Sequence, residues 1–453
     1  MGDGTELVAA VRRGDAAAVA GLLEAGAAPD TLAGDGLPVL CLAVAARDAE
    51  VASALVEGGA DPDRPLPDGS TPLVRAVDGG SRAVAAAVLG REPRLRLPEA
   101  ERERLLALAR RWYERGAEAE LRDRTGASGP VERFRVGDDE FDHVTRLVLG
   151  GVSVHEGHGA ILTDLEWAFR ILTPVDELVA RAVARLDRDH VDWSAARWVL
   201  GERLHRELWS AVTAHRRSPV SQRRLFVVDF LHWCLLTQWS RRNIYDGETA
   251  ELLTAWAVEG DADPEVLGDV LRVLGETDHP AQAEVGLRYA GHPAPCVRAQ
   301  VPWLLLAGDS PSAVSGPEAR AALLALAADR SADVRCMAGR ALAGALDGRS
   351  DLVDAVVGLL RDPDAAVRTS VADALADGPD RSPAVGDALV PLLDEEEFLT
   401  RLTAGYGLLL RDHPRTGEAV ERLRPLSRPG FEHDHRLSAL WDWDWRRTRG
   451  STA

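Results

Sequence analysis

The run His155-Glu156-Gly157-His158 contains side chains of the types that bind transition metals. A helical HExxH motif puts its two histidines one turn apart on one face, but here the spacing differs and glycine interrupts the run. We therefore predict a structural turn and no metal site. The sequence shows no convincing Ser/His/Asp or Cys/His spacing, no P-loop, and no GxGxxG motif ahead of a helix. We accordingly predict a protein that is not an enzyme and needs no cofactor.

Residues 193–242 differ from the acidic rest of the chain. They contain nine arginines, three acidic residues and five tryptophans, whereas the whole chain has a net charge of -19. Arginine next to aromatic side chains could stack on bases and contact phosphates. The alternatives are an acidic protein ligand, or plain packing in which arginine stems cover apolar faces. We favour packing and expect no nucleic-acid ligand. The residues of the alternative basic and aromatic patch are Arg203, Arg206, Arg223, Arg224, Trp198 and Trp209.

The C-terminal segment alternates tryptophan and aspartate, with Trp441, Trp443 and Trp445 separated by single acids. In a strand, the three indoles would share one face; in a helix, they would spread over half of the surface. Two interpretations stay open. The segment either closes the last unit of a repeat array, which needs a cap, or presents tryptophans that dock a protein partner.

The composition indicates a folded protein without a membrane segment. Apolar residues make up 46% of the 453 residues, and no run reaches the roughly 18 apolar residues that span a bilayer. The N-terminus lacks the basic and apolar regions of a secretory signal. The four cysteines form no CxxC pair, which argues against disulfides and zinc. We therefore expect a cytoplasmic protein.

A 33-residue period runs through the first 90 residues, where Leu7, Leu40 and Leu73 are equally spaced. Each period predicts two short helices with a break near Gly14, Arg47 or Gly80. Units of this size cannot bury their apolar faces alone, so they stack.

Residues 5–90 resemble ankyrin repeats, because 68–73 read DGSTPL and 58–63 read GGADPD. The family's histidine after TPL is Val74 here. The resemblance implies that finger loops at about 29–37 and 62–70 contact a protein partner through acids. The alternative is that these acids form turns and helix caps. The candidate binding residues are Asp30, Asp35, Asp63 and Asp68.

Residues 93–187 break the period. The segment 98–119 predicts a helix, and VERFRV with HVTRLVLGGVSV predicts a small β-hairpin. Helical spacing returns at 160–171 and 175–186.

A second array follows, in which Arg335, Arg368 and Arg401 are again 33 residues apart. Its units begin with an arginine-containing helix, as in DRSADVRCMAGRALA, and continue with a partner helix. Roughly 188–425 resemble HEAT repeats with a D-x-x-x-x-V-R start. The resemblance implies that Asp329 and Asp362 cap helices and that Arg298, Arg335 and Arg368 bond within the stack. It also implies that the second helix of each pair lines the concave face.

The sequence therefore predicts an all-α tandem-repeat solenoid, with an ankyrin array, a HEAT array and an irregular connector containing the hairpin. The predicted domains are 1–92, 93–187, 188–425 and 426–453. The predicted function is a protein-binding scaffold or regulator, and sequestration of a toxic partner, as by an immunity protein, is its specific version. The alternative is a HEAT-scaffold enzyme or nucleic-acid-binding protein, similar to a bilin lyase or a helical-repeat DNA glycosylase, acting through 193–242.

Overall fold

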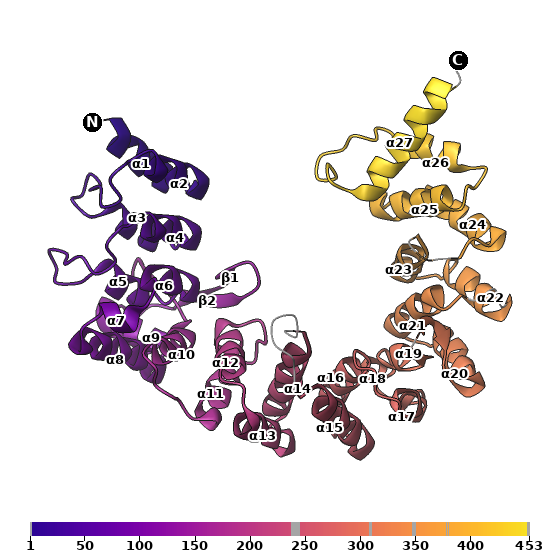
Figure 1. The fold of residues 1–453 in the computed structure, drawn as a ribbon, viewed down its shortest axis with the longest axis horizontal. Coiled ribbons are helices and arrows are strands. Elements are labelled where there is room, and N and C mark those ends of the chain that lie inside the picture. The colour runs from indigo at the N-terminus through magenta and orange to yellow at the C-terminus, as the bar shows by residue number, and fades with distance from the viewer. Residues whose placement is uncertain are drawn as a thin grey trace. The chain divides into compact units, whose positions relative to one another are not determined.

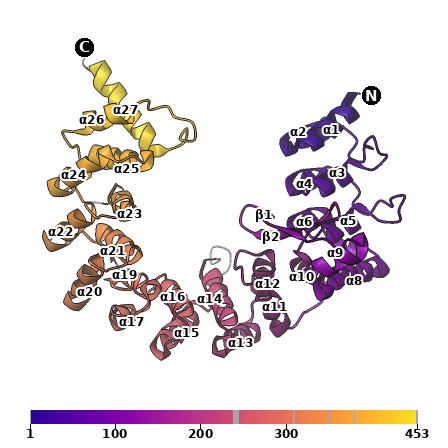
Figure 2. The ribbon, with the colours of Figure 1, turned by 180° about the vertical axis from the view of Figure 1, so that it is seen from behind.

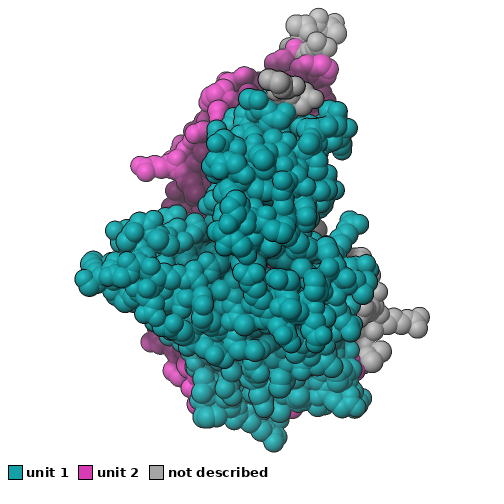
Figure 3. Space-filling view, turned by 90° about the vertical axis from the view of Figure 1, so that its left-hand side faces the viewer, with its two compact units in different colours: residues 1–233 teal, residues 234–453 magenta. Residues whose placement is uncertain are grey.

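A computed structural model describes residues 2–236, 245–307, 310–346, 350–376, 378 and 380–450. The chain divides into two compact units, Met1–Trp233 and Cys234–Ala453 (Figure 3). Trp239, Arg241 and Arg242 of the basic region lie outside the described residues. The four domains expected from the sequence remain predictions. No helix in the described ranges is both long and apolar enough to cross a membrane.

Unit 1 begins with three helix pairs (Figure 1). The breaks fall where the sequence predicted them, because Gly14, Arg47 and Gly80 adopt positive φ angles of 70°, 58° and 76°. An aspartate or serine side chain caps each helix that follows a break, as when Asp48 Oδ1 accepts from Val51 N at 3.0 Å. The helices are α1 (Gly2–Arg13), α2 (Ala16–Glu24), α3 (Val39–Ala46), α4 (Ala49–Glu57), α5 (Pro72–Gly79) and α6 (Arg82–Leu89).

The repeated leucines form the core of these pairs. Leu7, Leu40 and Leu73 are at most 1% exposed and belong to one apolar cluster. Helices α1, α3 and α5 contact one another in a row, and α2, α4 and α6 form a second row. The 33-residue period thus places equivalent leucines between successive helix pairs.

A small antiparallel sheet confirms the predicted hairpin and extends it by a third strand, in the order β1-β2-β3. Val136 pairs with Val144, and Leu147 pairs with Val154. The single helix predicted over 98–119 is wrong in one respect, because Gly116, with φ 80°, separates two helices. The elements are α7 (Pro93–Arg96), α8 (Glu99–Arg115), α9 (Ala117–Thr125), β1 (Glu132–Gly137), β2 (His143–Leu149), β3 (Val152–His155), α10 (His158–Ala168) and α11 (Val175–Ala182).

The sheet meets the helix pairs at Gly80. Gly157 N donates to Gly80 O at 3.1 Å, and a Cβ atom on Gly80 would lie 1.9 Å from His155 O. Both this close approach and the left-handed φ require glycine. The remaining helical elements of unit 1 are α12 (Val191–Glu202), α13 (Arg206–Ala214), the 3-10 turn η1 (His215–Arg217) and α14 (Ser221–Leu236).

Unit 2 consists mainly of paired helices in two rows, which Figures 1 and 2 show from opposite sides. We call α16, α19, α21, α23 and α25 the first row; α15, α17, α20, α22 and α24 form the other. The described elements are α15 (Asp246–Glu259), α16 (Pro264–Leu274), α17 (Gln282–Tyr289), α18 (Pro295–Arg298), α19 (Val301–Leu304), β4 (Leu306–Ala307), β5 (Ser310–Val314), α20 (Pro317–Ala327), α21 (Ala332–Gly344), α22 (Ser350–Leu359), α23 (Ala365–Ala376), α24 (Pro383–Leu389), η3 (Val390–Asp394), α25 (Phe398–Leu410), α26 (Thr416–Leu423) and α27 (His435–Gly450).

A ladder of arginine–carboxylate pairs joins successive units of unit 2. Arg298 donates two hydrogen bonds to Asp329 at 2.7 and 2.8 Å, and a third to the carbonyl of His292 at 2.7 Å. Arg335 bonds in the same way to Asp362, and Arg368 to Glu395. Each arginine therefore binds the turn that starts its own unit and the carboxylate that starts the next.

The carboxylates of the ladder also hold their own turns. Asp329 Oδ1 accepts from Ser331 N at 2.8 Å, and Asp362 Oδ1 accepts from Asp364 N at 2.9 Å. Hydrogen bonds from Arg298 to Asp329, and from Arg335 to Asp362, lower the pKa of each carboxyl group below its usual value. The stacking role expected for Arg298, Arg335 and Arg368 is thus what the structure shows. The capping role expected for Asp329 and Asp362 is wrong, because each carboxylate holds the turn before its helix, and at the start of α23 it is Asp364 that accepts from Ala366 N.

Removing one rung should destabilise unit 2 measurably. The side chains of Arg298 and Asp329 are only 6% and 12% exposed, so Arg298→Ala leaves buried acceptors unpaired. We expect the free energy of unfolding to fall by about 2 kcal/mol. Denaturant unfolding of the full chain measures this loss. Arg330→Ala, an exposed neighbour, is the control and should change stability by less than about 0.5 kcal/mol; equal losses in both variants would exclude the ladder as the cause.

Candidate functional site

The predicted finger acids lie in turns of the N-terminal helix pairs. Asp68 accepts from Ser70 N and Ser70 Oγ and pairs with Arg75. These hydrogen bonds, first those from Ser70, hold its pKa well below the usual value. Asp35 Oδ1 accepts from Leu37 N at 3.0 Å and is exposed. These contacts are those of turn-forming aspartates.

The other two finger acids connect neighbouring segments. Asp30 Oδ1 accepts from Asp61 N at 3.0 Å, which ties one loop to the next. Asp63 forms an ion pair with Arg96 of α7. The contact of Asp35 differs from these two, because it stays within its own turn.

In the basic Trp-rich region, several side chains within the described residues 193–236 bind other parts of the fold. Trp193 is 2% exposed, its indole donates to Asp229 at 2.8 Å, and Arg197 pairs with the same carboxylate. Arg203 and Arg224 donate to the carbonyls of Thr173 and Ser218.

The other four candidate residues of the predicted basic and aromatic patch lie on three helices. Trp198 of α12 is 41% exposed, Arg206 and Trp209 are on α13, and Arg223 is on α14. Most of the contacts described for the region join its side chains to other residues of unit 1.

The C-terminal tryptophans lie on helix α27. Its inner side adds Leu437, Leu440 and Trp443 to an apolar cluster with residues of α25 and α26. Trp441 and Trp445 are 51% and 44% exposed and stack with ring centroids 6.5 Å apart. The helix thus covers the last unit with one side and exposes two tryptophans on another.

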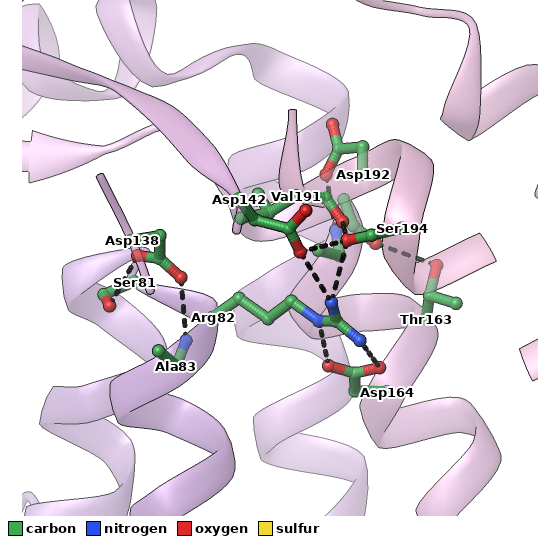
Figure 4. A network of polar contacts seen from close by, with 12 residues as sticks. Ser81, Arg82, Ala83, Asp138, Asp142, Thr163, Asp164, Val191, Asp192 and Ser194 are labelled. Atoms are coloured by element: carbon green, nitrogen blue, oxygen red, sulfur yellow. Dashed lines mark hydrogen bonds and ion pairs between the residues drawn. The ribbon is translucent and has the colours of Figure 1, made fainter. Parts of the chain in front are cut away.

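A buried polar network in unit 1 joins α6, the β1–β2 connection, α10 and α12 (Figure 4). Arg82 stands at its centre, with Nε 2.8 Å from Asp164 Oδ2 and Nη1 3.0 Å from Ser194 Oγ. Asp142 accepts from Ser194 and lies 3.5 Å from Arg82 Nη1. Nearby, Asp138 caps α6 by accepting from Ser81 Oγ and Ala83 N. The network fixes the sheet against the helices.

The histidines of the 155–158 run pack against, or lie close to, other side chains of unit 1. His158 stacks on Trp112 with centroids 4.7 Å apart, and burial lowers its pKa to about 4. His155 Nδ1 lies 3.5 Å from Asp138 Oδ1. No group of three or more His, Cys, Asp or Glu side chains suited to a metal occurs in the described part of the chain. The run therefore forms the turn between β3 and α10.

Asp192 is a buried carboxyl group where α10 and α12 begin. Its Oδ1 accepts from Ala160 N at 2.6 Å, and its own amide donates to His190 Nδ1 at 3.2 Å. Burial raises the pKa of Asp192 to about 7, against the effect of Arg185, and burial lowers the pKa of His190 to about 4. The same burial thus raises the pKa of the acid and lowers the pKa of the histidine at this junction.

Unit 1 also has an apolar pocket next to the network, with a volume of about 330 Å³. Trp167 and Trp198 line it, together with Leu89, Ile161 and the Arg82–Asp164 pair. Both charges of that pair are already hydrogen-bonded to each other. The pocket offers apolar contact but no charge that lacks a partner.

The candidate that best suits a macromolecular ligand is a groove on the first row of unit 2, of about 530 Å³. Trp303 and Met337 provide its half-buried apolar surface, and Arg272, Glu276 and Arg340 provide charged groups. The groove uses α16, α19, α21 and α23, which include the arginine-containing helices that begin each unit. This location differs from the second helices implied by the resemblance.

Sequence reasoning missed this groove. Trp303, Met337 and Arg340 come from two units and have no motif of their own. The signal available was the spacing of Met337 and Arg340 on one helix face, three residues apart, but that pattern is equally typical of packed or solvated helices.

Comparisons with known proteins identify part of this architecture. The family model of HEAT repeats matches residues 319–408. No curated protein matches the chain. The solved structure of YibA from E. coli is 16% identical, with a TM-score of 0.42, and the match covers 60% of this chain and 92% of that one. Human deoxyhypusine hydroxylase in complex with glycerol is 16% identical, with a TM-score of 0.24, covering 63% and 97%.

Ankyrin repeats in residues 5–90 remain a prediction. The matched segment 319–408 contains two complete rungs of the ladder, Arg335–Asp362 and Arg368–Glu395. Residues 319–408 thus carry HEAT repeats, and the chain is an all-α tandem-repeat solenoid with a small antiparallel sheet.

Proposed function

We propose that this protein is a non-enzymatic scaffold or regulator that binds another protein in the groove of unit 2. The groove carries the proposal, because Trp and Met are enriched at protein interfaces and exposed Trp side chains often dominate binding energy. Its walls come from successive repeat units, which the ladder holds in register. A preformed surface of this kind loses little freedom on binding.

The proposal extends to the rest of the chain. The three N-terminal helix pairs are ankyrin repeats in this proposal, supported by the DGSTPL motif and by glycine turns at equivalent positions. Sequestration of a toxic partner is its specific version. The cysteines at 41, 234, 296 and 336 form no disulfide bond with one another, which suits a reducing, cytoplasmic setting. A structural role for residues 193–236, in preference to nucleic-acid binding, is part of this proposal and is supported by the hydrogen bonds of Trp193, Arg197, Arg203 and Arg224 within the fold.

Affinity capture from the native lysate, followed by mass spectrometry, tests the proposal. We expect Trp303→Ala with Met337→Ala to lose the captured partner, since truncation of central interface residues costs about 2 kcal/mol or more. Two matched variants locate the site: Trp441→Ala with Trp445→Ala on α27, and Asp35→Arg in the finger loop. Each purified variant is first checked for an unchanged melting temperature.

If the groove variant retains the partner while the α27 or finger variant loses it, the groove is not the binding site. If the wild-type chain specifically captures no protein, the scaffold proposal itself is wrong.

A further inference from the structure

The negative charge of this protein is concentrated in one stretch. Residues 245–400 contain 28 acidic residues and 11 arginines, which is a net charge of -17 out of -19 for the whole chain. Three of those arginines, 298, 335 and 368, are bound in the ladder. The repeats that form the groove therefore create a strongly negative field, which attracts positively charged ligands.

Acids also lie at the groove itself. Glu276 and Asp278 are among the residues that line it, and both are exposed. Asp333 is exposed and lies four residues before Met337 on α21, so both side chains are on the same helix face. The neighbouring Arg272 is within 3.0 Å of Glu276 and 3.7 Å of Asp269. Its charge is thus offset by two carboxylates.

The aromatic group in the groove suits a cation as well. Trp303 is half-buried in the groove wall, and an indole face is the best aromatic partner for a guanidinium or ammonium group. Acidic side chains beside a groove wall that contains a tryptophan are complementary to a segment that combines basic and apolar side chains. Among the residues that line the groove, Arg340 is the one exposed side chain with a positive charge, which would repel a basic ligand.

We infer that the groove of unit 2 binds a basic, partly apolar segment of a partner protein, whose cationic side chains meet Glu276, Asp278 and Asp333 and stack on Trp303. This inference rests on the proposed function and specifies its partner. It requires that acidic residues at the groove contribute more to the affinity for the ligand than acidic residues elsewhere on unit 2.

Fluorescence anisotropy with defined probes tests the inference on the full-length chain. One probe is a short labelled peptide of arginine, leucine and serine; the other has glutamate in place of arginine. We expect only the arginine peptide to bind, with an affinity that falls as salt rises. Asp278→Arg with Asp333→Arg should weaken its binding about tenfold or more, a loss equivalent to about 1.4 kcal/mol. Trp303→Ala should weaken it as well, whereas Arg340→Glu should strengthen it.

The matched control reverses the same number of charges outside the groove. Glu318→Arg with Asp354→Arg changes exposed acids of α20 and α22, in the other row. This variant should bind the arginine peptide within about twofold of wild type, since distant exposed charges are screened by salt. Equal weakening in both double variants would mean that overall charge, and not the groove, attracts the peptide.

The remaining outcomes separate this inference from the proposed function. Three results would contradict the inference that the ligand is a basic segment. These are preference for the glutamate peptide, no binding of either peptide, and weaker binding of the arginine peptide by Arg340→Glu. If Trp303→Ala with Met337→Ala nevertheless loses the natural partner, the scaffold function stands with a ligand of other chemistry.

Discussion

Arg181→Ala should lower the free energy of unfolding of unit 1 by about 3–5 kcal/mol, the cost of breaking a buried ion pair by removing one partner. Arg181 is 1% exposed and donates to Glu166 at 2.7 and 3.2 Å. Burial alone would raise the pKa of Glu166, but hydrogen bonds from Arg181 and Thr173 keep it below its usual value. Without Arg181, a buried carboxylate would lose its main counter-ion. Denaturant unfolding measures the loss, and hydrogen exchange in α10 and α11 locates it.

Two further variants test the cause of that loss. Arg185→Ala removes a 42% exposed arginine that pairs with Glu156, and should cost no more than about 1 kcal/mol. Glu166→Gln in the Arg181→Ala background should recover part of the stability, because it removes the unpaired charge. No recovery would show that lost packing around the arginine stem, and not the buried charge, is responsible.

Asp192→Asn should make the protein more stable relative to wild type as the pH rises. Wild-type Asp192 has a pKa raised by burial from 3.8 to about 7. Its contribution to stability is therefore fully present below pH 3.8 and is lost as the pH rises through about 7, where the folded carboxyl group must ionise. Asparagine does not ionise. We expect the difference in unfolding free energy, variant minus wild type, to increase by about 2–3 kcal/mol between about pH 5 and pH 8.

Denaturant unfolding across this pH range measures that difference. His158 and His190, whose pKa values are lowered by burial to about 4, contribute stability above pH 6.5 that is lost as the pH falls toward 4. They remain in the variant, so their effect largely cancels. The exposed Asp189→Asn is the control and should give a difference nearly independent of pH. A flat difference for Asp192→Asn would mean that this carboxyl group is already ionised at pH 5.

The repeats were predictable from sequence because they depend on local, periodic signals. Leu7, Leu40 and Leu73 indicate the core, and Gly14 and Gly80 indicate the turns, because equivalent residues recur along the sequence at a fixed spacing. The D-x-x-x-x-V-R pattern likewise indicated that Arg335 and Arg368 serve the stack. Their particular partners, Asp362 and Glu395, follow from how units pack and not from the pattern alone.

The network and the groove were not predictable in the same way. Arg82, Asp164 and Ser194 are separated by up to 112 residues, and nothing local relates them. The helix predicted over 98–119 continued past Gly116, because one glycine inside an otherwise helical pattern is often tolerated. The finger acids were visible as acids, but their roles depend on backbone amides such as Asp61 N, whose directions a sequence does not show.

The ladder makes the units of the C-terminal array interchangeable. Every rung joins an arginine in one unit to the first carboxylate of the next, so each unit carries a donor toward one neighbour and an acceptor toward the other. Excision of residues 329–361 would bring Asp362 into the position of Asp329, opposite Arg298, and the connection would be re-formed. Such head-to-tail connectors would let a gene gain or lose whole units by recombination while the ladder stays continuous, although this excision would also remove Asp351, the partner of Arg320. The length of the array is therefore a property that evolution can change in steps of one unit.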